Sequence, residues 1–200
     1  MWVKVCGVTS VDQALQVQAC GVDAIGLNLV PSSKRCISPA LAAELAEALD
    51  CEVVLLVANM DEIELGERVD QIQPDRVQLH GSESPSFGAW LGTPLLKAHR
   101  AKPGVLDDIQ RFGQQRFLLD AYVPGELGGT GARVDLVLAR QAATLGECVL
   151  AGGLRPENVA EIIDAVRPWG VDTASGVESE PGLKDMARVR AFVEAAKGPR

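Results

Sequence analysis

Short apolar runs alternate with longer amphipathic segments from one end of the chain to the other. The short runs are rich in Val, Leu and Ile, as buried β-strands are, and the longer segments repeat apolar residues at helical spacing. The pattern predicts strands at Trp2–Cys6, Asp23–Val30, Glu52–Ala58, Arg76–His80, Pro94–His99, Arg116–Ala121, Cys148–Ala151 and Val171–Ser175. It predicts helices at Ser10–Cys20, Ser38–Leu49, Glu62–Ile72, Val105–Phe112, Val134–Leu145, Pro156–Val166 and Leu183–Ala196.

Strands that alternate with helices are typical of a parallel sheet whose crossovers are right-handed. Eight predicted strands in 200 residues leave 200/8 = 25 residues for each strand and its helix. Two architectures fit this arithmetic, a closed (β/α)8 barrel and a doubly wound open sheet. Near-uniform strands, and a chain that stops after the last helix, favour the barrel. We therefore expect an α/β protein, one (β/α)8 TIM barrel domain over residues 1–200.

Two prolines predict where helices begin, because proline is favoured at the first helical position. Ser38 precedes Pro39 and is a good N-cap residue. In the same way, Pro156 predicts that the helix after the seventh strand begins there.

Composition excludes several classes of protein. The chain has 19 Lys and Arg against 27 Asp and Glu, a net charge of −8, so we expect no nucleic-acid partner. No apolar run approaches the roughly 18 residues of a membrane span, and a strand at Val3–Val5 leaves no room for a secretory signal. The cysteines are odd in number and form no C-x-x-C pair, which predicts neither disulfides nor a metal site. We expect a cytoplasmic protein.

The first strand carries a lysine and a cysteine on one face, because Lys4 and Cys6 are two residues apart. Active groups of such barrels lie at the C-terminal ends of the strands, where Cys6 stands. A lysine beside a thiol favours the reactive thiolate. The alternative is that Cys6 is a small buried hydrophobic residue.

An acidic residue, Asp120, ends the sixth predicted strand and precedes the glycine-rich segment Pro124–Gly131. Partial burial raises the pKa of a carboxyl group and suits it to general acid catalysis. The alternative is an aspartate that merely begins a turn. The segment is neither a Walker motif nor a Rossmann fingerprint, so we interpret it as a mobile lid.

Glycine turns follow the last two strands. Gly152 and Gly153 lead into a helix N-terminus, and Ser175 and Gly176 follow the eighth strand. Backbone N–H groups at such places bind anions, and these are the loops that often hold phosphate in this fold. We expect a phosphate site there.

Two further polar residues stand at predicted strand ends. Arg35, in Ser33-Lys34-Arg35, follows strand two and suits a carboxylate, although a solvated loop is the alternative. His80 ends strand four, where a lone histidine is more often structural.

Taken in order, several segments resemble the phosphoribosylanthranilate isomerases, (β/α)8 enzymes of tryptophan biosynthesis. The similar segments cover nearly the whole chain: Val3-Lys4-Val5-Cys6-Gly7, Ser33-Lys34-Arg35 with Ser38-Pro39, Val77-Gln78-Leu79-His80-Gly81, Leu119-Asp120 with Gly128-Gly129-Thr130-Gly131, Leu150-Ala151-Gly152-Gly153-Leu154 with Pro156-Glu157-Asn158-Val159, and Val171-Asp172 with Ser175-Gly176-Val177-Glu178 and Pro181-Gly182-Leu183-Lys184-Asp185.

The resemblance implies conversion of N-(5′-phosphoribosyl)anthranilate to the deoxyribulose isomer by an Amadori rearrangement, without cofactor or metal. It assigns Cys6 as general base and Asp120 as general acid. Arg35 would hold the anthranilate carboxylate and Asp172 the sugar hydroxyls, and the two glycine loops would hold the phosphate. We place Lys4 and His80 with the substrate-binding residues.

Two positions depart from the family pattern. No aromatic residue follows strand two, and Ala174 stands where a second serine is common, so backbone N–H groups would carry more of the phosphate binding. We expect a small phosphorylated substrate, no membrane partner, and a monomer or homodimer. A barrel that binds phosphate without turnover is the alternative.

Overall fold

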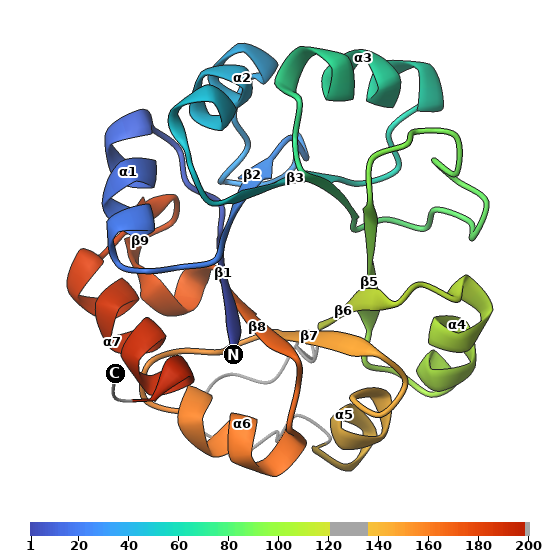
Figure 1. The fold of residues 1–200 in the computed structure, drawn as a ribbon, viewed down its shortest axis with the longest axis vertical. Coiled ribbons are helices and arrows are strands. Elements are labelled where there is room, and N and C mark those ends of the chain that lie inside the picture. Colours follow the sequence, from blue (N-terminus) through green and yellow to red (C-terminus); the bar gives the residue numbers. More distant parts are fainter. Residues whose placement is uncertain (121–135, 199–200) are drawn as a thin grey trace.

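The predicted strands close into a barrel. The computed structural model describes residues 1–120 and 136–198. In it, parallel strands follow one another in sequence order around a closed barrel, and the last pairs with the first (Figure 1). The barrel strands are β1 (Trp2–Cys6), β2 (Ala24–Asn28), β3 (Glu52–Val57), β4 (Arg76–Leu79), β5 (Leu95–Arg100), β6 (Arg116–Asp120), β7 (Glu147–Ala151) and β8 (Gly170–Thr173). The open-sheet alternative is therefore wrong.

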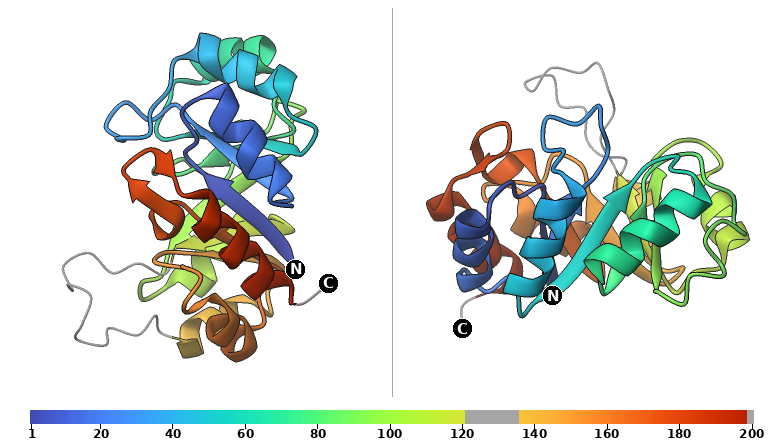
Figure 2. Two further views of the ribbon diagram at one scale, coloured as in Figure 1. Left: turned by 90° about the vertical axis from the view of Figure 1, so that its left-hand side faces the viewer. Right: turned by 90° about the horizontal axis from the view of Figure 1, so that it is seen from above.

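Helices surround the barrel on its outside (Figures 1 and 2). Each turns an apolar face toward the strands, as Leu45 and Leu65, both fully buried, illustrate. Within the described residues, no helix is long and apolar enough to cross a membrane. The helices are α1 (Val11–Ala19), α2 (Pro39–Ala48), α3 (Glu62–Ile72), α4 (Val105–Phe112), α5 (Leu136–Ala142), α6 (Val159–Val166) and α7 (Met186–Lys197).

Alternation along the strands divides the apolar core in two. Val53 and Leu55 belong to the large cluster between strands and helices, whereas Val54 points into the barrel with Leu118 and Val149. The two clusters together fill both sides of the sheet, so the barrel is a packed core rather than a channel.

Aromatic and charged side chains close the N-terminal end of the barrel. The rings of Trp2 and Trp169 lie 5.3 Å apart, and the Arg116 guanidinium lies 3.9 Å from the centroid of Trp169. Glu52 accepts a hydrogen bond from Arg76 at 2.8 Å beside them. These side chains close the barrel interior at this end.

The predicted helices include none between β4 and β5, and the structure has none there. The connections differ from the predicted pattern at two places. After β8 the chain forms a 3-10 turn (Ser175–Val177) and a two-stranded hairpin of β9 (Glu178–Glu180) and β10 (Leu183–Lys184) before α7. Finally, α6 begins at Val159 rather than at Pro156, because Asn158 folds back and bonds Gly153 O and Arg155 N. The cap at Ser38 and Pro39 is confirmed.

Candidate functional site

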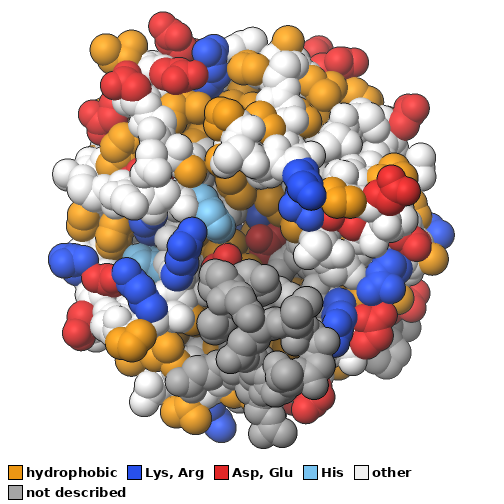
Figure 3. Space-filling view, turned by 180° about the vertical axis from the view of Figure 1, so that it is seen from behind, with side chains coloured by type: hydrophobic (Ala, Val, Ile, Leu, Met, Phe, Trp, Pro, Cys, Tyr) orange, Lys and Arg blue, Asp and Glu red, His pale blue; other side chains and the backbone are white. Residues whose placement is uncertain are grey.

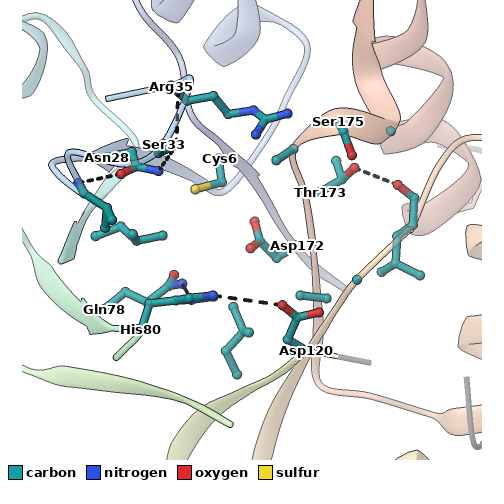
Figure 4. Close-up of a pocket in the computed structure, with 18 of the residues that line it drawn as sticks. Cys6, Asn28, Ser33, Arg35, Gln78, His80, Asp120, Asp172, Thr173 and Ser175 are labelled. Atoms are coloured by element: carbon teal, nitrogen blue, oxygen red, sulfur yellow. Dashed lines mark hydrogen bonds and ion pairs between the residues drawn. The ribbon is translucent and has the colours of Figure 1, made fainter. Parts of the chain in front are cut away.

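A cavity of about 470 Å³ opens at the C-terminal ends of the strands. Figure 3 views that end, where basic, acidic and histidine side chains surround a hollow. Cys6, His80, Asp120 and Asp172 point into the cavity from four strands or strand ends (Figure 4). The remaining predicted residues that line it are Arg35, Gly152, Gly153, Ser175 and Gly176.

Cys6 is buried at the floor of this cavity, where Gly26 of the neighbouring strand leaves room for its thiol. A Cβ atom at Gly26 would lie 2.7 Å from the Cys6 Sγ atom. Burial raises the pKa of the Cys6 thiol, and the Lys4 ammonium opposes this only in part. Lys4 therefore favours the thiolate, as its position on the strand predicts, but burial is the larger effect and leaves the pKa of Cys6 above its ordinary value.

Lys4 does not line the cavity. Its side chain is 0% exposed, and its Nζ atom lies 3.0 Å from Asp172 Oδ1, its register partner on β8. Burial lowers the pKa of Lys4, but Asp172 and Cys6 outweigh it, so the pKa lies above its ordinary value. The placement of Lys4 among the substrate-binding residues is corrected: it is a buried cation beneath the floor.

His80 faces Asp120 across the cavity. The Nε2 atom of His80 lies 4.0 Å from Asp120 Oδ2. The buried Gln78 side chain lies 3.1 Å from the other ring nitrogen, Nδ1. Burial lowers the pKa of His80, although Asp120 opposes it, so the ring is neutral at neutral pH.

Arg35 is held by an acidic residue that the sequence pattern did not single out as a site. Its Nε and Nη2 atoms donate to Glu178 Oε1 and Oε2 at 2.7 and 2.6 Å. Gly7 allows this placement, because a side chain there would collide with the stem of Arg35. Arg35 is thus oriented from behind while it lines the cavity, and is not a freely solvated loop residue.

The loops after β7 and β8 are locked together. Gly152 and Gly153 have φ angles of 94° and 70°, which favour glycine. The Thr173 hydroxyl donates to Leu154 O at 2.7 Å, and a side chain at Gly176 would collide with the same carbonyl. Neighbouring loops of glycine and small residues therefore form one wall of the cavity.

Two polar residues near β2, Asn28 and Ser33, also line the cavity, and the sequence pattern did not single them out as site residues. Asn28 ends β2, bonds Val30 N at 2.8 Å and donates to Ser33 Oγ at 3.1 Å, which shapes the loop that carries Arg35. The sequence did hold a signal for Asn28, because it is a polar residue at the end of a buried strand. The glycine-rich segment 124–131 lies outside the described residues.

The donor set of this cavity does not form a metal site. Over residues 1–120 and 136–198, no three His, Cys, Asp or Glu side chains gather in a way that would hold a metal ion. The polar groups present are suited to proton transfer and anion binding.

Comparisons with known proteins point to one family over nearly the full length of this chain. The profile of the N-(5′-phosphoribosyl)anthranilate (PRA) isomerase family matches residues 3–195. Isomerases of that name from Pseudomonas aeruginosa and Geotalea uraniireducens are 44% and 42% identical, covering 99% and 98% of this chain and 96% and 98% of theirs. The crystal structure of the Thermotoga maritima phosphoribosyl anthranilate isomerase superposes with a TM-score of 0.91, at 33% identity and full coverage of both chains. Another solved isomerase, 32% identical with a TM-score of 0.86 and full coverage, is in complex with reduced 1-(o-carboxyphenylamino)-1-deoxyribulose 5-phosphate.

Proposed function

Because this chain belongs to the PRA isomerase family, we propose that the cavity is its active site, with Cys6 as general base and Asp120 as general acid. The reaction is the isomerisation of N-(5′-phosphoribosyl)anthranilate to 1-(2-carboxyphenylamino)-1-deoxyribulose 5-phosphate in tryptophan biosynthesis. The observation that carries the assignment is that Cys6 and Asp120, from β1 and β6, line the same cavity.

The two residues divide the proton transfers of an Amadori rearrangement. The Asp120 carboxyl group protonates the furanose ring oxygen, the bond from that oxygen to C1′ breaks, and the nitrogen lone pair forms a protonated Schiff base. Cys6 acts as base once its thiol has lost its proton, which the Lys4 ammonium favours against burial. The thiolate then removes the proton at C2′, which gives the enolamine. The enolamine tautomerises to the ketone, and the proton gained by Cys6 balances the one released by Asp120 over the cycle.

Substrate charge supports the placement of the other groups. The phosphate would lie against the backbone of Gly152, Gly153, Ser175 and Gly176, where small residues permit close approach. The anthranilate carboxylate would meet Arg35, and Asp172 would accept hydrogen bonds from sugar hydroxyls. Local groups of this kind are needed because the chain as a whole carries a charge of −8.

His80 completes the proposed substrate-binding set. Its neutral ring lies beside Asp120, 4.0 Å away, at the place where the ring oxygen must receive its proton. There it would orient the acid and the sugar without adding a second acid to the site.

An anthranilate fluorescence assay tests the assignment. Cys6→Ala and Asp120→Asn should each lower kcat by about two to four orders of magnitude, the range expected for a lost acid or base. Circular dichroism and thermal unfolding establish that each variant is folded. Near-normal turnover in folded Cys6→Ala would show that another group is the base.

We also propose a cytoplasmic enzyme that acts as a monomer or homodimer. One solved relative concerns monomers generated from a dimeric isomerase of Thermotoga maritima. Analytical ultracentrifugation of the purified chain tests the state, and a stable assembly larger than a dimer would contradict it.

A further inference from the structure

A buried lysine lies behind the arginine that faces the cavity. Lys184, on β10, has a side chain that is 0% exposed, and its Nζ atom lies 2.7 Å from Glu178 Oε1. Glu178 is the carboxylate that binds Arg35 through two hydrogen bonds. Lys184, Glu178 and Arg35 therefore form a continuous charged trio, and Arg35 is its only member that lines the cavity among the residues described.

The carboxylate at the centre of the trio is fully engaged. Glu178 Oε1 accepts from Arg35 Nε, Lys184 Nζ and, at 3.2 Å, Gly182 N, while Oε2 accepts from Arg35 Nη2. Burial raises the pKa of Glu178, but its bonds to Arg35 and Lys184 outweigh this and lower it. Glu178 is therefore ionised at neutral pH. Burial lowers the pKa of Lys184 and its hydrogen bond to Glu178 opposes this; with Lys184 protonated, the trio has a net charge of 2 − 1 = +1.

Lys184 also ties the trio to the catalytic end of the barrel. Its Nζ atom donates to the backbone carbonyls of Cys6, at 2.7 Å, and of Ala174, at 3.1 Å. Cys6 is the last residue of β1, and Ala174 directly follows β8. The ammonium thus has a fixed position relative to the thiol and to the loop of Ser175, and it cannot move away from Glu178 without breaking both bonds.

We propose that Lys184 is a positioning residue that determines specificity: by neutralising Glu178 it leaves the full charge of Arg35 available to a carboxylate on the substrate. This rests on the proposed role of Arg35 in binding the anthranilate carboxylate. Without Lys184, Arg35 and Glu178 form a neutral pair, whose field at the cavity is weak. The pair with Glu178 does not use the Nη1 atom of Arg35 or the second N–H group of Nη2, and these are the donors proposed for the ligand.

A pair of ligands separates this role from a structural one. One is the reduced 1-(o-carboxyphenylamino)-1-deoxyribulose 5-phosphate, and the other is the same compound with an unsubstituted phenyl ring. The ratio of their dissociation constants, measured by calorimetry on each folded variant, reports recognition of the carboxylate alone. A general loss of folding or of phosphate binding changes both constants and leaves the ratio unchanged.

Lys184→Met should reduce the preference for the carboxylate ligand about tenfold, because it removes one unit of charge near a partly buried site. The double variant Lys184→Met with Glu178→Gln restores the net charge of +1 and keeps an amide oxygen for Arg35. We expect its ratio to return to within about threefold of the parent value. A double variant no better than Lys184→Met alone would overturn the proposal, since a merely structural lysine gives that result.

Two further variants complete the test. Lys97→Met is a matched control, because Lys97 is also buried and bonds a buried carboxylate, Glu83, at 2.8 Å, on the other side of the barrel. The ratio of its two dissociation constants should equal that of the parent.

Arg35→Met should abolish the preference for the carboxylate ligand. If it does not, the proposed role of Arg35 fails. If it does while Lys184→Met has no effect, only the inference about Lys184 fails.

Discussion

The Nε2 atom of His80 lies 4.0 Å from the Oδ2 atom of Asp120 across the mouth of the barrel. Behind the ring, the amide nitrogen of Gln78 lies 3.1 Å from His80 Nδ1. An amide nitrogen can only donate, so Nδ1 is the acceptor and the proton of the neutral ring resides on Nε2, facing Asp120. Gln78 therefore sets the tautomer that the carboxylate meets.

Replacing Gln78 should change the titration of His80. In Gln78→Leu the hydrogen bond that favours the neutral ring is lost, so the pKa of His80 should rise. We expect the acid limb of the pH–kcat profile to move to higher pH and kcat at neutral pH to fall about three- to tenfold. Nitrogen NMR of the labelled ring reports tautomer and pKa together. An unchanged ratio of the two tautomers would contradict the role assigned to Gln78.

The ion pair beneath Cys6 should act on the thiol in two opposite ways. Lys4 lowers the pKa of Cys6 and Asp172 raises it, so Lys4→Met should raise the pKa and Asp172→Asn should lower it. Thiolate absorbance in the ultraviolet against pH measures both, with Cys6→Ala as the blank. Shifts in the same direction would show that a change of burial, rather than charge, dominates. In the parent protein, alkylation of Cys6 should be slow at neutral pH and should accelerate as pH rises.

Acid stability should depend on His99. Burial, with a smaller effect of Lys97, lowers the pKa of His99 to about 4, and its ring packs edge-on against Phe112 at 5.1 Å. Because the folded pKa is below the unfolded value, the neutral ring's contribution is complete above about pH 6.5 and is lost as pH falls toward 4. The loss is on the order of 3 kcal/mol. His99→Leu should remove that part of the pH dependence in urea unfolding, whereas an identical slope in both proteins would contradict it.

The hydroxyl that joins the two glycine loops should affect binding more than turnover. Thr173→Val removes the hydrogen bond to Leu154 O, which contributes about 1 kcal/mol. We expect KM and the inhibition constant of inorganic phosphate to rise about fivefold, with little change in kcat. Thr144→Val is a matched control, because the Thr144 hydroxyl also bonds a carbonyl, that of Gln141, but on the helical side of the barrel. If kcat falls and KM stays constant, the loops do not hold the phosphate.

Much of the fold follows from local patterns. Strand β1 and helices α3 and α4 have the bounds that apolar spacing predicts. The strand is a short, continuously buried run, and each of the two helices buries one face and has a cap residue or a glycine at its ends. Alternation along the strands, together with the rule that parallel strands end at one edge, also placed Cys6 and Asp120 at the same end of the barrel. The hairpin of β9 and β10 was not predicted, because two short strands carry too few residues to show a period.

By itself, the sequence determined the order of strands and helices, the family, and the residue types at each strand end. Only the tertiary structure decided which charges meet. Glu178 is 143 residues from Arg35, and Lys4 reaches Asp172 because the first and last strands pair when the barrel closes. The same closure buries Cys6 and raises its pKa, where spacing alone favoured a thiolate. Electrostatic effects depend on distance and burial in space, and neither quantity is encoded in the spacing of residues along a chain.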